Sequence, residues 1–350
     1  MPIIAPLELE SPCLFAGFPG DIPCFATVDG RVHSPAWHEA VPVAQGGLTA
    51  IALSAAGDYL FTGGEDGTVR CLNFPPAARA DTAPEPRLVA HIKGKWIDCL
   101  AAAPQGGSFA FSCGRRLYFG TAARHGQPPI AGEMPPLRQW QMERSAEGLD
   151  FAAKGLRLAV ARYNGVSLYW PELDAPPQKL EWKGAHIGVT FSPDRRYIIT
   201  IMQENALHGW RLEDGGHLRM SGYPAKVKSL SWSFRGRYLA TSGAPAAILW
   251  PFIGKDGPMN KTPLELGTRG DSMVVCVACH PQQDSVAIGY ADGMILLARF
   301  ADMSERVLRR STQGAITCLN WDKAGRRLAF GTEFGAAGLV NPDEEIYHQK

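Results

Sequence analysis

The segment Cys276-Val-Ala-Cys279-His280 is the arrangement of residues in this sequence that most resembles a chemical site. Its spacing matches the attachment motif for c-type haem. The same residues could also begin a zinc site, but a structural zinc site needs four convergent ligands, and the sequence contains no second Cys-x-x-Cys pair. The elements that would carry these side chains therefore decide what they can bind.

The two cysteines lie in an apolar segment, Val274–Cys279, that is typical of a β-strand. Side chains alternate between the two faces of a strand, so Cys276 and Cys279 are expected on opposite faces. The first residues, Met1–Glu10, have neither the basic region nor the apolar region of an export signal, which haem attachment requires. We expect a structural role for this motif, with no haem, no bound metal and no other cofactor.

Other catalytic patterns are missing from the sequence. It contains no His-Glu-x-x-His, no Gly-x-Ser-x-Gly and no glycine-rich loop that ends in Gly-Lys-Ser/Thr. The stretch Gly254–Pro258 places a lysine beside glycines, but no predicted helix follows it, as a phosphate site would require. The sequence therefore predicts a protein that is not an enzyme.

A repeat of about 40 residues is the strongest signal in the chain. Each copy has an apolar strand, a polar turn, a second strand that ends in small residues, a glycine-rich turn and a third strand; the clearest copies are Ile51–Leu72, Val189–Thr200 and Leu230–Gly243. The last core residues of the first strands align as Phe18, Leu53, Ala102, Phe151, Phe191, Trp232, Cys279 and Trp321. The residue seven positions further on is apolar each time, which gives eight copies.

We name the strands of each copy a, b and c, and expect a strand d before the next copy. The predicted d strands are Val41–Ala44, Arg87–Ala90, Leu137–Gln141, Lys179–Trp182, His217–Met220, Leu264–Leu266 and Arg306–Arg309. A four-stranded sheet cannot cover its own faces, so neighbouring copies must stack. We predict an all-β fold with one domain over residues 1–350, a single closed β-propeller of eight four-stranded blades, with seven as the alternative. Ile3–Leu9 is expected to be the closing strand of the last blade.

Several turns resemble those of the WD40 repeat family across nearly the whole chain, in a divergent form like that of some bacterial WD40 proteins. The resemblance rests on Ser192–Asp194, on Thr62–Gly67, on Tyr290–Gly293, and on tryptophans that end third strands, such as Trp210 and Trp250. No third strand ends in a Trp-Asp pair, and the Gly-His pair of the family is missing. The resemblance implies an incomplete His–Ser–Asp–Trp hydrogen-bond network and a role in assembling complexes.

Composition narrows the class of protein further. The formal net charge is +1, and charged residues make up 20% of the chain, so no strong overall field favours nucleic acid or anionic membranes. No apolar run approaches the roughly 18 residues of a membrane span. The eight cysteines lie mostly in apolar segments and do not indicate disulfides. We expect a cytoplasmic monomer whose partners are proteins.

Loop residues of copies three to six are the predicted contacts with a partner, because strands are committed to packing. They lie in d–a loops and b–c turns, which emerge on one side of a propeller, and combine aromatic and charged groups typical of interface hot spots. The residues are Lys95, Trp96, Arg162, Tyr163, Asn164, Trp182, His186, Gln203, Glu204, Tyr223 and Lys226. The alternative is that Trp96 and Trp182 pack between blades while Arg162 and the lysines are solvated.

Three functions are compatible with these patterns. The first is a non-catalytic scaffold that binds a macromolecular partner through one face. The second is an accessory role in metal homeostasis with a metallochaperone GTPase, which resemblance to compact bacterial WD40-like proteins implies. The third, a propeller enzyme that uses the central channel, predicts carboxylates and histidines where first strands begin, but those positions are small or apolar, as at Ala50, Ile187 and Gly188.

Overall fold

The computed structural model describes residues 6–75, 79–122, 134–312 and 314–342. In these ranges the regular structure is β-strand apart from two 3-10 helices, η1 (Pro19–Asp21) and η2 (Phe234–Gly236). The strands form seven sheets, six with four strands and one with six strands. The chain divides into two compact units, Met1–Thr27 with Met220–Lys350, and Val28–Arg219.

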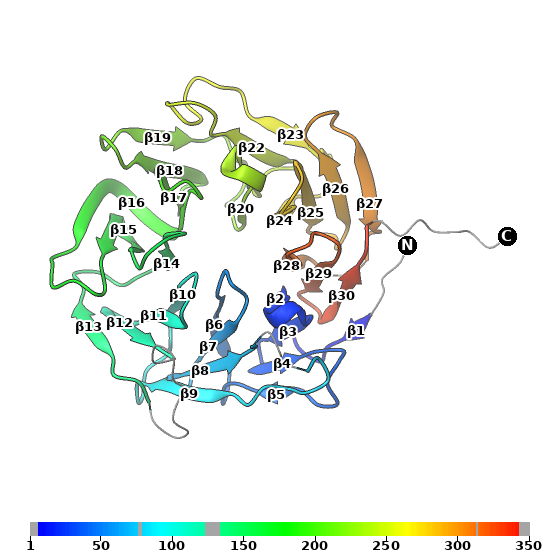
Figure 1. Cartoon of the computed structure of the whole chain (residues 1–350). Helices are drawn as coiled ribbons and strands as arrows, with labels where there is room; N and C mark the ends of the chain where they lie inside the picture. The colour runs from blue at the N-terminus through cyan, green and yellow to red at the C-terminus, as the bar shows by residue number, and fades with distance from the viewer. Residues whose placement is uncertain (1–5, 76–78, 123–133, 313, 343–350) are drawn as a thin grey trace. The chain divides into compact units, whose positions relative to one another are not determined.

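The first unit contains three complete sheets, in the orders β20-β21-β22-β23, β24-β25-β26-β27 and β1-β30-β29-β28, together with the hairpin β2–β3 (Figure 1). Its strands are β1 (Leu7–Glu8), β2 (Cys13–Gly17), β3 (Cys24–Thr27), β20 (Leu230–Trp232), β21 (Tyr238–Thr241), β22 (Ala247–Pro251), β23 (Leu264–Leu266), β24 (Val274–Cys279), β25 (Ser285–Tyr290), β26 (Ile295–Arg299), β27 (Glu305–Arg309), β28 (Ile316–Trp321), β29 (Leu328–Thr332) and β30 (Ala336–Val340). Neighbouring strands in these sheets pair in the antiparallel direction.

The second unit contains the hairpin β4–β5, the four-stranded sheets β6–β9 and β10–β13, and the six-stranded sheet β14–β19. Its strands are β4 (Arg31–His33), β5 (Val41–Pro42), β6 (Leu48–Leu53), β7 (Tyr59–Gly64), β8 (Thr68–Asn73), β9 (Arg87–His91), β10 (Cys99–Ala102), β11 (Ser108–Cys113), β12 (Arg116–Thr121), β13 (Arg138–Gln141), β14 (Gly148–Phe151), β15 (Leu158–Tyr169), β16 (Gln178–Phe191), β17 (Tyr197–Met202), β18 (Ala206–Arg211) and β19 (His217–Met220). The boundary after Thr27 falls within the seventh sheet, β2–β5, so its two hairpins are described separately.

The repeat predicted from the sequence corresponds to eight antiparallel hairpins of strands a and b. In seven copies the aligned residues are direct cross-strand partners: Leu53 and Leu60, Ala102 and Phe109, Phe151 and Leu158, Phe191 and Ile198, Trp232 and Leu239, Cys279 and Val286, and Trp321 and Leu328. In the first copy, Gly17 pairs with Cys24, directly beside Phe18 and Phe25. The spacing of seven is therefore the separation of two paired residues on either side of the a–b turn.

The expected eight separate blades are not found, because the number of separate sheets is seven. The reason is β16, which is one continuous strand over Gln178–Phe191. Its first part pairs with β15 and its second part with β17. The predicted strand d of the fourth copy and strand a of the fifth copy are thus one strand, which joins both copies into the six-stranded sheet.

The predicted d strands agree with the structure. The expected segments His217–Met220 and Leu264–Leu266 match β19 and β23 at both ends, and the others overlap β5, β9, β13, β16 and β27. The expected closing strand Ile3–Leu9 corresponds to β1, which pairs with β30, whereas residues 1–5 lie outside the described residues. Strand d is therefore recognisable from its alternation alone.

Apolar side chains fill the space between neighbouring sheets within each unit. In the second unit, Phe61 of β7 and Phe109 of β11 are fully buried and stack with ring centroids 4.9 Å apart. In the first unit, Leu249 of β22 and Ile288 of β25 belong to one buried cluster. Burial of each such side chain contributes about 2–3 kcal/mol. The sheets are thus held by their faces, and the turns and loops lie at their ends.

Polar side chains one position before the last core residue of strand a also connect neighbouring a strands. The Phe191 N–H donates to Asp150 Oδ2 at 2.7 Å, and the Cys279 N–H donates to Ser231 Oγ at 2.9 Å. Asn320 Nδ2 donates to the Ala16 carbonyl at 2.6 Å. One register position thus provides hydrogen bonds between neighbouring a strands in both units.

Candidate interaction surface

Loops of the second unit and two strand segments beside them form a connected surface, which we call the loop face. It comprises residues 92–98, 113–116, 142–147 and 202–206, together with 162–165 of β15 and 182–186 of β16. Hydrogen bonds join its first segments in order. Asp98 Oδ2 accepts the Gly114 N–H, the Met142 N–H donates to the Arg115 carbonyl at 2.8 Å, and Cys99 beside the first segment donates its S–H toward the Ala146 carbonyl.

Further contacts link these segments to the six-stranded sheet. Arg144 lies over the ring of Tyr163, with its guanidinium carbon 6.0 Å from the centroid. Asn164 Oδ1 accepts the Gly184 N–H at 3.2 Å. The Gln203 N–H donates to the carbonyl of residue 185 at 3.0 Å. The segments of the predicted surface that belong to the second unit therefore lie next to one another.

Trp96 is the most exposed aromatic side chain of the loop face, with 60% of its surface accessible. Its backbone is nevertheless fixed, because the Ile97 N–H donates to the Gly64 carbonyl at 3.2 Å and Thr49 Oγ1 donates to the Ile97 carbonyl at 2.6 Å. The Ile97 side chain is fully buried next to Gly63, where an added Cβ would lie 2.5 Å from it. The alternative that Trp96 packs between sheets is wrong, whereas Lys95 is exposed as expected.

Tyr163 is the second exposed aromatic residue, with 50% of its surface accessible. The tight turn that presents it needs two residues with positive φ, Asn164 at 65° and Gly165 at 129°. An added Cβ at Gly165 would lie 2.0 Å from the Leu180 carbonyl oxygen, so only glycine fits there. The turn therefore holds the tyrosine in one position above the sheet.

Arg162 is buried beneath this turn and is not available to a partner. Its Nε donates to Ser167 Oγ at 2.9 Å, and its Nη2 donates to Glu181 Oε1 at 2.6 Å. Its Nη1 donates to the carbonyls of Tyr163 at 3.1 Å and Asn164 at 3.3 Å. The expectation that Arg162 contacts a partner is corrected by this geometry, because all three guanidinium nitrogens are engaged in holding the turn.

His186 is fully buried as well and belongs to the core of the sheet. Its Nδ1 lies 2.7 Å from Thr200 Oγ1, and its Nε2 lies 3.0 Å from the Trp182 carbonyl oxygen. Burial lowers the pKa of His186, so the neutral form is favoured. Trp182 is half-buried and stacks on His208 with centroids 4.0 Å apart, which agrees with the packing alternative for this tryptophan.

This histidine–threonine pair is part of the hydrogen-bond network that the WD40 resemblance implies. The nearby Trp210 Nε1 is buried and has no hydrogen-bond partner among the described residues. The network is therefore incomplete at this copy, as expected. Gln203 and Glu204, in the following turn, are exposed, and Glu204 lies next to Gly184.

Two of the expected contact residues belong to the other unit. Tyr223 is buried, and its hydroxyl lies 2.7 Å from Thr241 Oγ1 and accepts the Trp250 Nε1–H at 2.6 Å. Burial raises the pKa of Tyr223 to about 12. Tyr223 is therefore a structural residue, which corrects the expectation, and Lys226 is half-buried.

Sequence reasoning missed exposed residues that belong to the same kinds of turn. Arg115 and Arg116 are exposed in the b–c turn between β11 and β12, and Arg144 is exposed in a d–a loop. In the first unit, Phe334 is 68% exposed in the b–c turn between β29 and β30. Their positions in the repeat are the signal that could have identified them.

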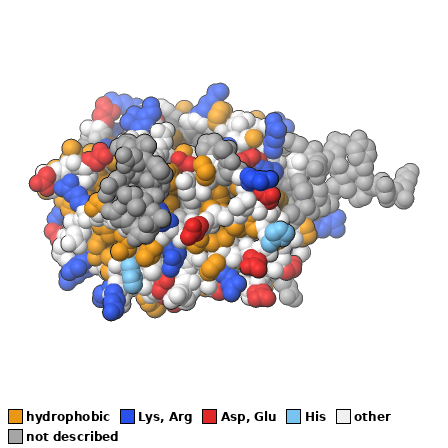
Figure 2. All heavy atoms as spheres, turned by 60° about the horizontal axis from the view of Figure 1, so that its bottom comes forward, with side chains coloured by type: hydrophobic (Ala, Val, Ile, Leu, Met, Phe, Trp, Pro, Cys, Tyr) orange, Lys and Arg blue, Asp and Glu red, His pale blue; other side chains and the backbone are white. Residues whose placement is uncertain are grey.

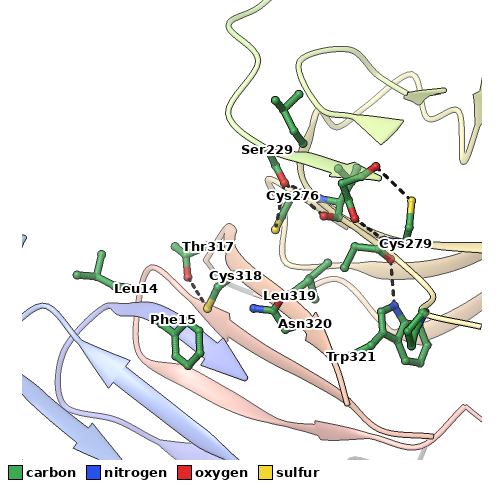
Figure 3. Close-up of a pocket in the computed structure, with 15 residues that line it drawn as sticks. Leu14, Phe15, Ser229, Cys276, Cys279, Thr317, Cys318, Leu319, Asn320 and Trp321 are labelled. Carbon is green, nitrogen blue, oxygen red and sulfur yellow. Dashed lines mark hydrogen bonds between the residues drawn. The ribbon is translucent and has the colours of Figure 1, made fainter. Parts of the chain in front are cut away.

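The haem-like motif lines a cavity of about 380 Å³ in the first unit, shown in Figure 3. Cys276 and Cys279 pack into different core clusters, in agreement with the expected alternation. His280 Nε2 lies 2.9 Å from the Gly325 carbonyl oxygen. Within the described ranges, no three or more His, Cys, Asp or Glu side chains are placed to hold a metal ion. No helix in the part of the chain that the structure describes is long and apolar enough to cross a membrane.

Antiparallel sheets of four strands, repeated along the chain and stacked face to face, define an all-β propeller protein. The family model of the WD domain, G-beta repeat, matches residues 40–73, which span β5 to β8. This match and the repeated antiparallel sheets support a WD40-like β-propeller. No curated protein matches it. Propellers of this class commonly act as protein-interaction scaffolds and are typically not enzymes.

Proposed function

We propose that this protein is a non-catalytic scaffold that binds a protein partner through the loop face of the second unit. The observation that carries the proposal is that Trp96 and Tyr163 expose half or more of their surfaces on backbones fixed by hydrogen bonds. Large aromatic side chains provide much of the binding energy at interfaces. A fixed backbone lowers the entropy lost on binding, because the segments that carry these side chains are already ordered.

The charges of the loop face favour a protein over nucleic acid. Exposed cations such as Lys95 and Arg144 alternate with exposed acids such as Glu147 and Glu204. Figure 2 shows acidic and basic side chains interspersed over the side of the molecule that lies at the bottom of Figure 1. A phosphate backbone needs a stripe of one sign, whereas a mixed surface is suited to a protein with complementary charges. We also propose a cytoplasmic location, because all eight cysteines are free thiols.

The test is affinity capture from the native cells with the parent protein and with the double variant Trp96→Ala and Tyr163→Ala. We expect at least a tenfold loss of the captured partner, because each truncation removes an exposed anchor. The unfolding midpoint should change little, since neither side chain is buried. The matched control is Leu173→Ala, which truncates a side chain that is 55% exposed outside the loop face.

Two results would contradict the proposal. One is equal capture by the parent and the double variant. The other is an equal loss for Leu173→Ala, which would indicate a general effect of removing surface apolar groups. A partner that is retained by the control and lost by the double variant supports the loop face as the binding surface.

A further inference from the structure

We propose that Cys13 and Cys318 of the first unit are an oxidative modification site that forms a reversible disulfide. Cys13 lies in β2 and Cys318 in β28, 305 positions later in the sequence. The Cys318 S–H donates to Cys13 Sγ at 3.7 Å, and both residues are buried. A disulfide needs its sulfurs about 2 Å apart, so they must approach by less than 2 Å.

The two strands are held against each other on both sides of the thiol pair. Thr317 Oγ1 donates to the Cys13 carbonyl at 2.6 Å, directly beside the pair. Asn320 Nδ2 donates to the Ala16 carbonyl at 2.6 Å further along the strands. These bonds hold the two backbones beside each other, so side-chain rotation can bring the two sulfurs together.

Gly331 gives the sulfurs room to move. It is the cross-strand partner of Cys318 in β29. A Cβ added at Gly331 would lie 2.5 Å from Cys13 Sγ and 2.9 Å from Cys318 Sγ. Both sulfurs therefore occupy the space where any other residue would place its side chain. The glycine makes the paired thiols possible.

A small oxidant can reach the pair through the cavity in Figure 3. Thr317, Cys318 and Cys276 line this cavity, and 8% of the Cys318 surface is accessible. Cys13 is fully buried and does not line the cavity. Cys318 is therefore the thiol that reacts first, and Cys13 is the thiol that completes the bond.

The chemistry with hydrogen peroxide is balanced in two steps. The Cys318 sulfur attacks one peroxide oxygen, the O–O bond breaks, and a sulfenic acid and one water form. The Cys13 sulfur then attacks the Cys318 sulfur, so that the S–S bond forms, the S–O bond breaks, and the Cys13 proton leaves with the hydroxyl group as a second water. Two thiols are oxidised and one peroxide is reduced to two waters. A dithiol reductant reverses the change.

The pair is adapted to strong rather than mild oxidation. The hydrogen bond between Cys318 and Cys13 and the burial of Cys318 both raise the pKa of the Cys318 thiol. The thiolate is the reactive form, so the reaction should be slow at neutral pH and faster as the pH rises. Such a site would respond to sustained peroxide and not to the resting redox state of the cytoplasm.

The experiment treats the intact protein with hydrogen peroxide at neutral pH and blocks the remaining thiols with an alkylating reagent after denaturation. Peptide mapping without reductant should show Cys13 linked to Cys318, with two hydrogen atoms lost from the intact mass. The oxidised protein should unfold at a temperature several degrees higher, because the bond closes a long loop. Dithiothreitol should restore both the mass and the unfolding temperature.

The matched variants are Cys13→Ser and Cys24→Ser. Cys24 is buried in the adjacent β3 of the same unit, and its variant should form the disulfide normally. Cys13→Ser should lose both the crosslink and the thermal shift. The proposal is overturned if Cys13 and Cys318 stay alkylatable in the parent protein, or if Cys318 advances to sulfinic acid without a crosslink. Mapping of the parent protein gives this answer even if a variant fails to fold.

Discussion

Asp150 provides a test of how neighbouring a strands of the second unit are held together. Its carboxylate accepts the Phe191 N–H at 2.7 Å between two neighbouring a strands. Burial raises the pKa of Asp150 from 3.8 to about 7. Asp150→Asn keeps an acceptor oxygen for this N–H and removes the titratable proton, so it isolates the cost of the charge.

The sign of the effect follows from proton linkage. Because the folded state holds its proton more tightly than the unfolded chain, this carboxyl group favours folding at low pH. That contribution is lost as the pH rises from about 4 through about 7. The asparagine variant has no such loss. Relative to the parent protein, it should therefore gain stability as the pH rises.

The size of the effect can be bounded from the structure. Each tenfold change in proton affinity corresponds to about 1.4 kcal/mol, so a pKa raised from 3.8 to about 7 corresponds to at most about 4 kcal/mol. The side chain is only partly buried, so solvent reduces the difference, and we expect about 1–2 kcal/mol. For a unit of this size that is a shift in Tm of roughly 2–8 °C.

The assay is urea unfolding of both proteins at pH 5, 6, 7 and 8, followed by circular dichroism. All other titrating groups are common to the two proteins, so the difference between the two free energies of unfolding reports Asp150 alone. We expect a difference that grows toward pH 8. A difference independent of pH, or one that grows toward pH 5, would refute the burial of a costly charge at this position.

Three further substitutions test the turns and networks by urea unfolding. Arg162→Ala should destabilise the protein by about 2–3 kcal/mol, because it leaves Glu181 and two turn carbonyls without their donor; a change below about 0.5 kcal/mol would contradict its structural role. Gly165→Ala should cost about 2–4 kcal/mol through its contact with the Leu180 carbonyl, and a neutral result would refute the geometry of this turn. Tyr223→Phe should cost about 1–2 kcal/mol by removing two buried hydrogen bonds, and an unchanged midpoint would show that they contribute nothing.

The hairpins were predictable from the sequence because their signal is local. Strand alternation and turn chemistry fix the pairing of Leu53 with Leu60 and of Phe191 with Ile198 within a dozen residues. The number of separate sheets was not predictable in the same way. It depends on whether the backbone between Trp182 and His186 bends or continues, and the sequence does not show that Gly184 adopts a positive φ of 120° while β16 continues through it.

The sequence predicted which face of the repeats carries the candidate site, but it did not predict which side chains there point to solvent. Trp96 lies in a loop, as the repeat predicted, whereas Tyr163 lies within β15, and both side chains are exposed. The repeat could not tell that Arg162, His186 and Tyr223 turn inward to hydrogen-bond partners within the sheets. Long polar side chains at the end of a strand can reach either solvent or a buried acceptor, and the three-dimensional position of that acceptor decides.

The uninterrupted β16 has a consequence for how the second unit forms. The two repeat copies within residues 148–220 both contain part of β16. Neither copy can therefore be exchanged, deleted or inserted as a free module. We expect this region to open in hydrogen exchange as one cooperative block, whereas the sheets β6–β9 and β10–β13 can open one at a time. The fourth and fifth repeat copies are therefore expected to fold as a single unit.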